Sequence, residues 1–288
     1  MKVFLTGGSG YIGSAVAIAL KKAGHDVRAL VRSEAKGKAL HQAGVKLVVG
    51  DLKDPGGYSA AAWGCAAFVH TAIDYGKDTS ALDAKTVQAA KDLLRGQVGG
   101  TFIYTSGCWI YGSTGDDPVD ENSTIKPIRA SEWRVPHEKQ ALALADDGIR
   151  SVVVRPAIVY GGVRGGIPAM FFKGAPTVGD GANKWPMVHI DDLGELYVRL
   201  VERAPARSVW NAVDASRLTQ REIAEAASKT AGKDGVKSAK PDGTPFQEAL
   251  SISQVLSSEK ARNELEWRPR HESFTGEAEL LYKTFKSA

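Results

Sequence analysis

A chain of 288 residues is long enough to bury one large core, or one domain with a smaller second lobe. Its 37 basic and 33 acidic residues are too evenly balanced for a nucleic-acid partner. The N-terminus lacks the pattern of a signal peptide and no apolar stretch reaches about 18 residues, so we expect a cytoplasmic protein without a membrane partner. Cys65 and Cys108 predict no disulfide framework, and no CxxC or His/Cys cluster predicts a metal site.

The first 32 residues predict a strand, a glycine turn, a helix and a second strand. A short apolar run, Val3 to Leu5, leads into the sequence TGGSGYIG at residues 6–13. An Ala/Ile/Leu-rich segment with helical spacing follows and stops at Gly24, and a second apolar run covers residues 27–31. A βαβ unit of this size with this glycine spacing is the fingerprint of dinucleotide binding.

Each glycine of the turn has a physical reason. Gly7 allows the tight turn, Gly10 lets the backbone approach a pyrophosphate, and Gly13 lets the helix pack on the strand. The N–H groups at the start of the helix, around Tyr11 and Ile12, then face the anion together with the positive end of the helix dipole. The alternative is an ordinary glycine-rich turn of an α/β domain.

The TGxxGxxG spacing resembles the extended short-chain dehydrogenase/reductase superfamily, which is the NAD(P)-dependent epimerase/dehydratase group. The alternation of strands and helices predicts an α/β protein with a Rossmann-like, doubly wound parallel sheet. The resemblance implies that residues 1–160 form the NAD(P)-binding domain, with contributions from about 186–212. It also implies that residues 161–288 form mostly a small C-terminal substrate-binding lobe.

The end of the second predicted strand bears on the choice of cofactor. Family members that use NAD commonly place an acidic residue there, whereas this chain has Val31 followed by Arg32. A carboxylate repels a 2′-phosphate and a guanidinium binds it, so we expect NADP(H) in preference to NAD(H). Arg28 is either a second phosphate contact or a solvated strand residue.

Further cofactor contacts are implied by the resemblance. Asp51 and Leu52, after the predicted strand 45–49, would flank the adenine, although Asp51 also suits a helix cap. After the strand 66–71, the segment Thr71, Ala72 and Ile73 resembles the small-residue stretch that passes under the cofactor.

The catalytic hydroxyl of the family is displaced in this chain. Active members share a Ser or Thr, a Tyr and a Lys, and the Tyr transfers the proton. The hydroxyl usually lies four residues before the Tyr of a strand-end YG, here Tyr111, and that position is Gly107. Ser106 and Thr105 are the neighbouring hydroxyls, and we expect Tyr111 itself to be structural.

The predicted catalytic helix, in SEWRVPHEKQALALADDG (131–148), breaks the family pattern. Lys139 matches the family lysine that holds the nicotinamide ribose, but Val135 stands four residues earlier, where the tyrosine belongs. His137 and Glu138 are expected to be solvated helix residues. The dipeptide Trp133-Arg134 and the segment TSGCWIYG (105–112) resemble an atypical subgroup that keeps the glycine motif without the Tyr/Lys pair.

Later segments return to the family pattern. Pro156, in RPAIVYG (155–161), resembles the strand exit beside the nicotinamide. The Gly/Pro-rich residues 161–186 predict a loop, either a substrate lid or a plain connection. VHIDD (188–192) predicts a helix that starts at Asp191 or Asp192. The segment 257–270 resembles the final helix of the family.

The leading hypothesis is an NADP(H)-dependent oxidoreductase that acts on a small organic carbonyl or alcohol. Catalysis would rely on Ser106, Thr105 or a bound water, with Lys139 on the ribose. Two alternatives are a nucleotide-sugar epimerase or dehydratase, and an NADP(H)-binding sensor without turnover. We expect a small-molecule substrate, and the resemblance implies a homodimer.

Overall fold

The computed structural model describes residues 1–76 and 78–287 and divides the chain into two compact units. The first unit contains Met1–Ser106, Trp133–Val154 and Gly194–Trp210, and the second contains Gly107–Glu132, Arg155–Leu193 and Asn211–Ala288. The chain thus passes between the units several times. The role of the second unit as a substrate lobe stays a prediction.

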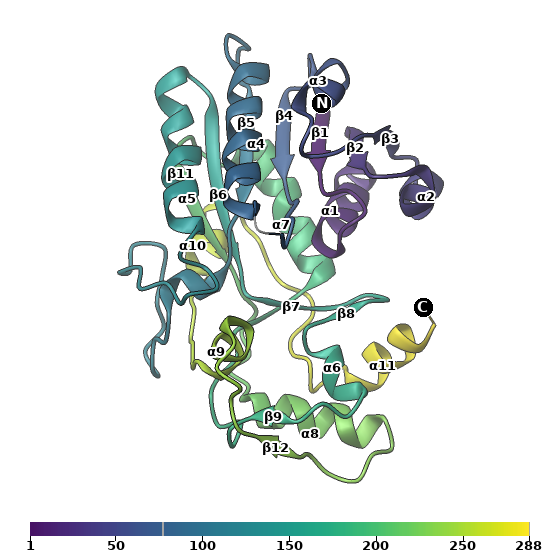
Figure 1. Cartoon of the computed structure of the whole chain (residues 1–288), viewed down its shortest axis with the longest axis vertical. Helices are drawn as coiled ribbons and strands as arrows, with labels where there is room; N and C mark the ends of the chain where they lie inside the picture. Colours follow the sequence, from purple (N-terminus) through teal and green to yellow (C-terminus); the bar gives the residue numbers. More distant parts are fainter. Residues whose placement is uncertain (77, 288) are drawn as a thin grey trace. The chain divides into compact units, whose positions relative to one another are not determined.

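The first unit is built on a seven-stranded sheet with the order β11-β6-β5-β4-β1-β2-β3. Adjacent strands from β3 to β6 pair in parallel, which confirms the expected Rossmann-like fold (Figure 1). The strands are β1 (Lys2–Thr6), β2 (Asp26–Val31), β3 (Lys46–Val49), β4 (Ala67–His70), β5 (Thr101–Thr105), β6 (Arg150–Pro156) and β11 (Ser208–Ala212).

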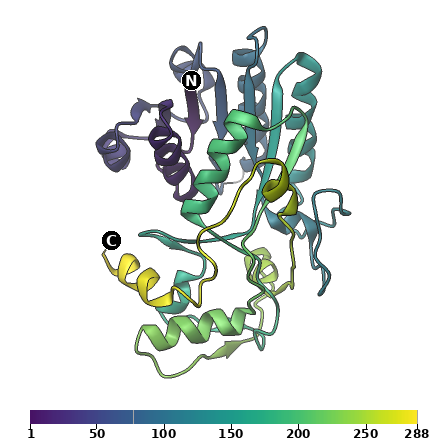
Figure 2. The same ribbon diagram turned by 180° about the vertical axis from the view of Figure 1, so that it is seen from behind.

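Helices cover both faces of this sheet. The helices α3, α4 and α5 lie on the face turned to the viewer in Figure 1, and α1, α2 and α7 lie on the opposite face, seen in Figure 2. Asp54, and not Asp51, caps α3, because its side chain accepts a hydrogen bond from the N–H of Gly57. The bounds are α1 (Tyr11–Lys22), α2 (Glu34–Gln42), α3 (Pro55–Ala62), α4 (Thr79–Leu94), α5 (Arg134–Ala143) and α7 (Ile190–Arg203).

Aromatic side chains of neighbouring strands form the core beneath α3 and α4. Phe4, Phe68 and Phe102 are buried, and their ring centroids lie 5.2 and 5.9 Å apart in succession. Tyr58 of α3 stacks on Phe4 at 5.4 Å. Burial of each such side chain stabilises the fold by roughly 1.5–3 kcal/mol, so these rings hold the helices against the sheet.

The second unit has smaller sheets around its own core. β7 (Ile158–Gly161) lies between β10 (Met187–His189) and β8 (Gly165–Gly166), and β9 (Thr177–Val178) pairs with β12 (Ser238–Ala239). Phe171, Phe172 and Trp185 are buried in this core, so much of the expected loop 161–186 is packed structure. The helices are α6 (Ala169–Phe172), α8 (Gln220–Thr230), α9 (Pro245–Ser251), α10 (Glu259–Glu264) and α11 (Ala278–Lys286).

One carboxylate joins the start of α7 to the C-terminal segment. Asp192 lies in the first turn of α7, as predicted, and is fully buried. Its side chain accepts hydrogen bonds from the N–H groups of Arg270 and His271 at 2.9 and 3.0 Å. Its backbone carbonyl accepts one from the indole of Trp267 at 2.9 Å. The segment after α10 therefore packs on α7 before the chain forms a further helix, α11.

Both thiols are buried and free. Burial raises the pKa of Cys108 to about 12 and also raises the pKa of Cys65, so neither is a reactive thiolate. No helix within residues 1–76 and 78–287 is long and apolar enough to cross a membrane.

Asp214 is a buried carboxyl with an incomplete set of partners. Its Oδ1 accepts hydrogen bonds from the N–H and the hydroxyl of Ser216 at 2.8 and 2.6 Å. Its Oδ2 and the Tyr160 hydroxyl are buried without a hydrogen-bond partner among the described residues. Burial raises the pKa of Asp214 to about 7, so the folded protein holds a proton there that the unfolded chain releases near pH 4.

We predict that Asp214→Asn flattens the pH dependence of stability. Between about pH 4 and pH 7 the folded parent binds more protons than the unfolded chain, so its free energy of unfolding falls as the pH rises, by up to about 4 kcal/mol. Asparagine cannot titrate and removes this slope. Urea unfolding at pH 5 and pH 8 measures the effect, with the exposed Asp234→Asn as control. An unchanged slope in Asp214→Asn would contradict the assignment.

Candidate functional site

The glycine turn between β1 and α1 is compact because its backbone folds onto itself. Gly7 has a positive φ of 79°, and its carbonyl accepts the N–H of Gly10 at 2.8 Å. A Cβ on Gly13 would lie 2.1 Å from that same carbonyl oxygen. The Gly7 carbonyl oxygen therefore closes the predicted tight turn and is also the atom that Gly13 of the helix approaches closely, as predicted.

The segment after β4 passes directly against this turn. A Cβ on Gly7 would lie 2.7 Å from the backbone N and Cα of Ala72. The Thr71 hydroxyl donates to the carbonyl of Thr6 at 2.7 Å and would lie 2.6 Å from a Cβ on Gly13. The structure therefore brings together Gly7, Gly13, Thr71 and Ala72, as the sequence predicts, and Ile73 follows them along the chain.

The start of α1 is suited to an anion. Gly10 is the N-cap, and the first turn, which begins with Tyr11 and Ile12, contains no acidic residue. The first N–H groups of a helix have no partner within the helix, and the helix dipole adds positive potential at this end. The turn thus offers backbone donors, positive potential and room next to glycine, which fits the pyrophosphate of a dinucleotide.

The ends of β2 and β3 carry the candidate ribose and adenine contacts. Val31 pairs with Val49, so Arg32 and Asp51 follow neighbouring strands at the same edge of the sheet. Arg32 is exposed, and Asp51 accepts a hydrogen bond from the N–H of Lys53 at 2.8 Å. Leu52 is half-buried.

Arg28 binds the backbone of a helix, which neither of the two alternatives given for it in the sequence analysis included. Its guanidinium donates to the backbone carbonyl of Ala61, in α3, at 2.7 Å. This bond attaches α3 to β2, so Arg28 supports the fold and is not a solvated strand residue.

The carboxyl end of β5 carries the two candidate catalytic hydroxyls. The Thr105 hydroxyl lies 2.5 Å from the hydroxyl of Tyr197, and its backbone carbonyl accepts a hydrogen bond from Arg134 at 2.9 Å. Ser106 is 6% exposed, and its Oγ has no hydrogen-bond partner within residues 1–76 and 78–287. Of the two hydroxyls, Ser106 is thus the one with unused hydrogen-bonding capacity.

Helix α5 differs from the expectation at two residues. His137 and Glu138 are 4% and 3% exposed and are not solvated. The ring nitrogens of His137 lie 2.6 and 2.8 Å from the backbone carbonyls of Trp133 and Ser80. The imidazole therefore joins α5 to α4 and is not available for proton transfer.

Two other α5 residues keep their predicted placement on the helix. Lys139 is exposed and Val135 is half-buried, and the two stand one helical turn apart. The ammonium group of Lys139 is therefore accessible to a ligand. The Val135 side chain has no ionisable group and cannot transfer a proton.

A buried polar chain behind the glycine turn gave no signal in the sequence. The Thr6 hydroxyl lies 2.7 Å from Nδ1 of His70, and Nε2 of His70 donates to Asp83 at 3.0 Å, while the Tyr104 hydroxyl donates to the other carboxylate oxygen at 2.7 Å. Burial alone would raise the pKa of Asp83, but the hydrogen bonds and charge of His70 and the bond from Tyr104 outweigh it and lower the pKa. We name these four residues the polar chain.

In the second unit, Tyr111 has the structural role that we expected. Its hydroxyl accepts a hydrogen bond from Arg155 at 2.7 Å and donates to Asn211 at 2.8 Å. Burial raises the pKa of Tyr111 to about 12, so the phenol stays protonated at neutral pH. Pro156 ends β6 and is buried in the same unit.

The chain is similar to proteins with known sequences and structures. The model of the NAD dependent epimerase/dehydratase family matches residues 3–212. An uncharacterized protein of Schizosaccharomyces pombe is 29% identical over 286 residues, covering 94% of this chain and 96% of that protein. The 2-alkyl-3-oxoalkanoate reductase of Stenotrophomonas maltophilia is 28% identical over 219 residues, covering 67% of this chain and 62% of that protein. The structure of the UDP-glucose 4-epimerase of Thermus thermophilus in complex with NAD is 22% identical and has a TM-score of 0.81. Its match covers 100% of both chains.

We predict that Gly13→Ala disrupts the turn. Its methyl group would meet the Gly7 carbonyl at 2.1 Å and the Thr71 hydroxyl at 2.6 Å, neither of which can move without shifting β1 or β4. We expect a loss of about 1–3 kcal/mol in the free energy of unfolding and more than about tenfold weaker dinucleotide binding, since the displaced turn no longer presents its N–H groups. Urea unfolding and fluorescence titrations with NADH and NADPH measure the two effects.

Gly56→Ala is the matched control, because its methyl group would have only ordinary contacts, the nearest at 3.4 Å, on the surface of α3. Parent-like NADPH affinity in Gly13→Ala would show that the turn does not hold the dinucleotide.

Proposed function

We propose that this chain, which belongs to the NAD-dependent epimerase/dehydratase family, is an NADP(H)-dependent oxidoreductase that acts on a small organic carbonyl or alcohol. The observation that carries the proposal is the Ser106 hydroxyl. It is buried at the carboxyl end of β5, where ligands bind in open parallel sheets, and its Oγ has no partner among the described residues. A buried hydroxyl without a partner in the chain is accounted for by a partner from outside it, such as a ligand or a water.

The dinucleotide, when bound, supplies or accepts the hydride. The residues that would hold it are those of the glycine turn and of the neighbouring strand ends. Lys139, exposed one turn after Val135, would bind the nicotinamide ribose. The full set is Gly7, Gly10, Tyr11, Ile12, Gly13, Arg32, Asp51, Leu52, Thr71, Ala72, Ile73, Lys139 and Pro156.

Ser106 would perform the polar part of catalysis. In carbonyl reduction the substrate oxygen gains negative charge, and a hydroxyl that donates a hydrogen bond to it stabilises that charge. Arg134, through its bond to the Thr105 carbonyl, holds the backbone next to Ser106. We propose that Val135 takes the place of the family tyrosine, so that the hydrogen bond comes from Ser106 and the proton from water.

The preference for NADP(H) rests on Arg32. The guanidinium is exposed at the end of β2, where a 2′-phosphate would lie, and no acidic residue precedes it in the strand after Asp26. Arginine can bind a phosphate with two parallel hydrogen bonds.

A second candidate is a nucleotide-sugar epimerase, since the similar Thermus thermophilus structure is a UDP-glucose 4-epimerase. Val135 disfavours it, because epimerisation needs a proton-transfer group as well as hydride transfer.

Incubation with NADPH or NADH and a panel of small aldehydes, ketones and keto esters, with UDP-glucose alongside, tests the two candidate functions. Consumption of NADPH with a carbonyl supports our proposal, whereas conversion of UDP-glucose supports the epimerase. Tight NADPH binding without any turnover would favour a sensor.

We predict that Ser106→Ala lowers kcat by about 10²-fold or more, since an oxyanion donor is lost, and leaves the affinity for NADPH unchanged. Steady-state kinetics on the best carbonyl substrate and an NADPH titration measure the two quantities. Ser151→Ala is the matched control, because that buried hydroxyl already donates to the Leu142 carbonyl at 3.0 Å. Full turnover in Ser106→Ala would contradict the assigned role.

We predict that Arg32→Ala weakens NADPH binding by about 10- to 100-fold, the cost of losing hydrogen bonds to a charged group. NADH lacks the 2′-phosphate, so its affinity should not change. The dissociation constants of NADPH and NADH, measured for the parent and for Arg32→Ala, test this prediction. Lys22→Ala, a change at an exposed residue, is the charge-matched control. Equal weakening of NADH and NADPH would mean that Arg32 does not read the phosphate.

A further inference from the structure

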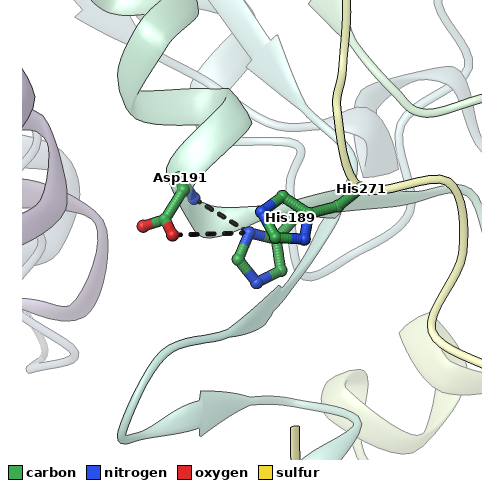
Figure 3. A group of neighbouring side chains, drawn as sticks. All are labelled: His189, Asp191 and His271. Atoms are coloured by element: carbon green, nitrogen blue, oxygen red, sulfur yellow. Dashed lines mark hydrogen bonds and ion pairs between the residues drawn. The ribbon is translucent and has the colours of Figure 1, made fainter. Parts of the chain in front are cut away.

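Three side chains from two distant parts of the sequence meet in the second unit. His189 ends β10, Asp191 lies in the first turn of α7, and His271 belongs to the segment between α10 and α11. One ligand atom of each lies within 4.8 Å of the other two. Figure 3 shows the imidazoles lying over one another beside the Asp191 carboxylate, with a nitrogen of each ring on the Asp191 side. The sequence offered no sign of this group, because 82 positions separate the two histidines.

The hydrogen bonds of His189 set which of its nitrogens carries a lone pair. Its Nδ1 accepts a hydrogen bond from the backbone N–H of Asp191 at 3.2 Å and lies 3.9 Å from an oxygen of the Asp191 carboxylate. A nitrogen that accepts an N–H hydrogen bond carries its lone pair on that side, so the Nδ1 lone pair of His189 lies on the Asp191 side of the ring. An ion bound to Nδ1 would replace the N–H of Asp191 as its partner.

His271 is oriented by a carboxylate. Its Nδ1 lies 2.7 Å from Oε2 of Glu277, so this nitrogen donates the hydrogen bond and Nε2 carries the lone pair in the neutral ring. A histidine that ligates a metal almost always donates its other N–H to a carboxylate, carbonyl or water, which sets the ring orientation and raises ligand basicity. Glu277 occupies this position.

The arrangement is also pre-organised and negatively charged. A Cβ on Gly161 would lie 2.1 Å from the His189 ring, and Tyr160 packs edge-on against it at 5.1 Å between centroids, so the ring has little freedom. The His271 ring stacks on it at 3.5 Å. The carboxylates of Asp191 and Glu277 lie beside the two imidazoles, 3.9 Å from Nδ1 of His189 and 2.7 Å from Nδ1 of His271. A bound cation would balance this charge.

We propose that His189, Asp191 and His271 bind one divalent transition-metal ion, with Glu277 as a positioning residue. Two imidazoles and one carboxylate suit a borderline ion such as Zn²⁺, Co²⁺ or Ni²⁺ rather than Mg²⁺ or Ca²⁺, which prefer oxygen ligands. Zinc–nitrogen bonds of about 2.0–2.1 Å require the ligand atoms to draw closer. Because the His189 ring is confined, Asp191 and the stacked His271 ring would have to rotate toward it. Asp191, whose side chain is 66% exposed, has the freedom to do so.

The site would join the start of α7 to the C-terminal segment, beside the Asp192 contacts described above. The ion therefore adds a cross-link to the second unit, and binding raises the thermal unfolding midpoint by mass action. The proposal does not depend on the oxidoreductase function, and its test needs no substrate.

The experiment titrates the full chain, without a polyhistidine tag and stripped with EDTA, with Co²⁺ and then with Zn²⁺. Visible absorption reports the coordination of Co²⁺, and calorimetry gives the stoichiometry and affinity of Zn²⁺. We expect one ion per chain, tetrahedral or five-coordinate Co²⁺ bands, and a higher melting temperature with Zn²⁺. His271→Ala and Asp191→Asn should weaken binding more than about tenfold, and Glu277→Gln by about 10- to 100-fold.

His41→Ala, a change at an exposed histidine of α2, is the matched control and should bind as the parent does. Asp191→Asn alters an exposed side chain, so its fold is expected to persist and circular dichroism checks this. The proposal is overturned if the parent shows no saturable binding of one ion, or if His271→Ala and Asp191→Asn bind it as tightly as the parent.

Discussion

The closeness of two backbone segments at the ends of β1 and β4 is the constraint on which the first unit depends. The carbonyl of Gly7 faces Gly13, and Ala72 lies against Gly7, at separations that leave no room for a Cβ. Larger residues would push α1 and the β4 exit away from the turn. The N–H groups at the start of α1 point to one place because the glycine turn, α1 and the segment after β4 meet without side chains between them.

The polar chain holds this crowded region together through buried hydrogen bonds. Thr6 and His70 end the two strands that meet at the turn, and Asp83 binds His70 from α4. Buried polar groups are costly unless each has a partner, and in the polar chain each side chain has one. The hydrogen bonds of the polar chain therefore also join β1, β4 and α4 to one another behind the glycine turn.

Local patterns in the sequence predicted the sheet and the glycine turn, because strand periodicity and glycine spacing act over a few positions. The apolar run Val3 to Leu5, which lies within β1, is one example. Burial of His137 and Glu138 was missed, since it depends on α4 packing against α5. The meeting of His189 and His271 was missed for the same reason, because long-range packing brings them together.

The division of the chain into interleaved segments has a consequence for synthesis on the ribosome. The first unit needs nothing beyond Trp210, so all of its segments are available while the last part of the chain is still being made. The second unit has Phe274 and Leu281 in its core and cannot be completed until these two residues emerge. Domains generally fold as units in the order of their synthesis. The sheet of the first unit therefore forms first, and the growing chain carries residues 107–132 and 155–193 as unfinished parts of the second unit until residues 274–281 have been added.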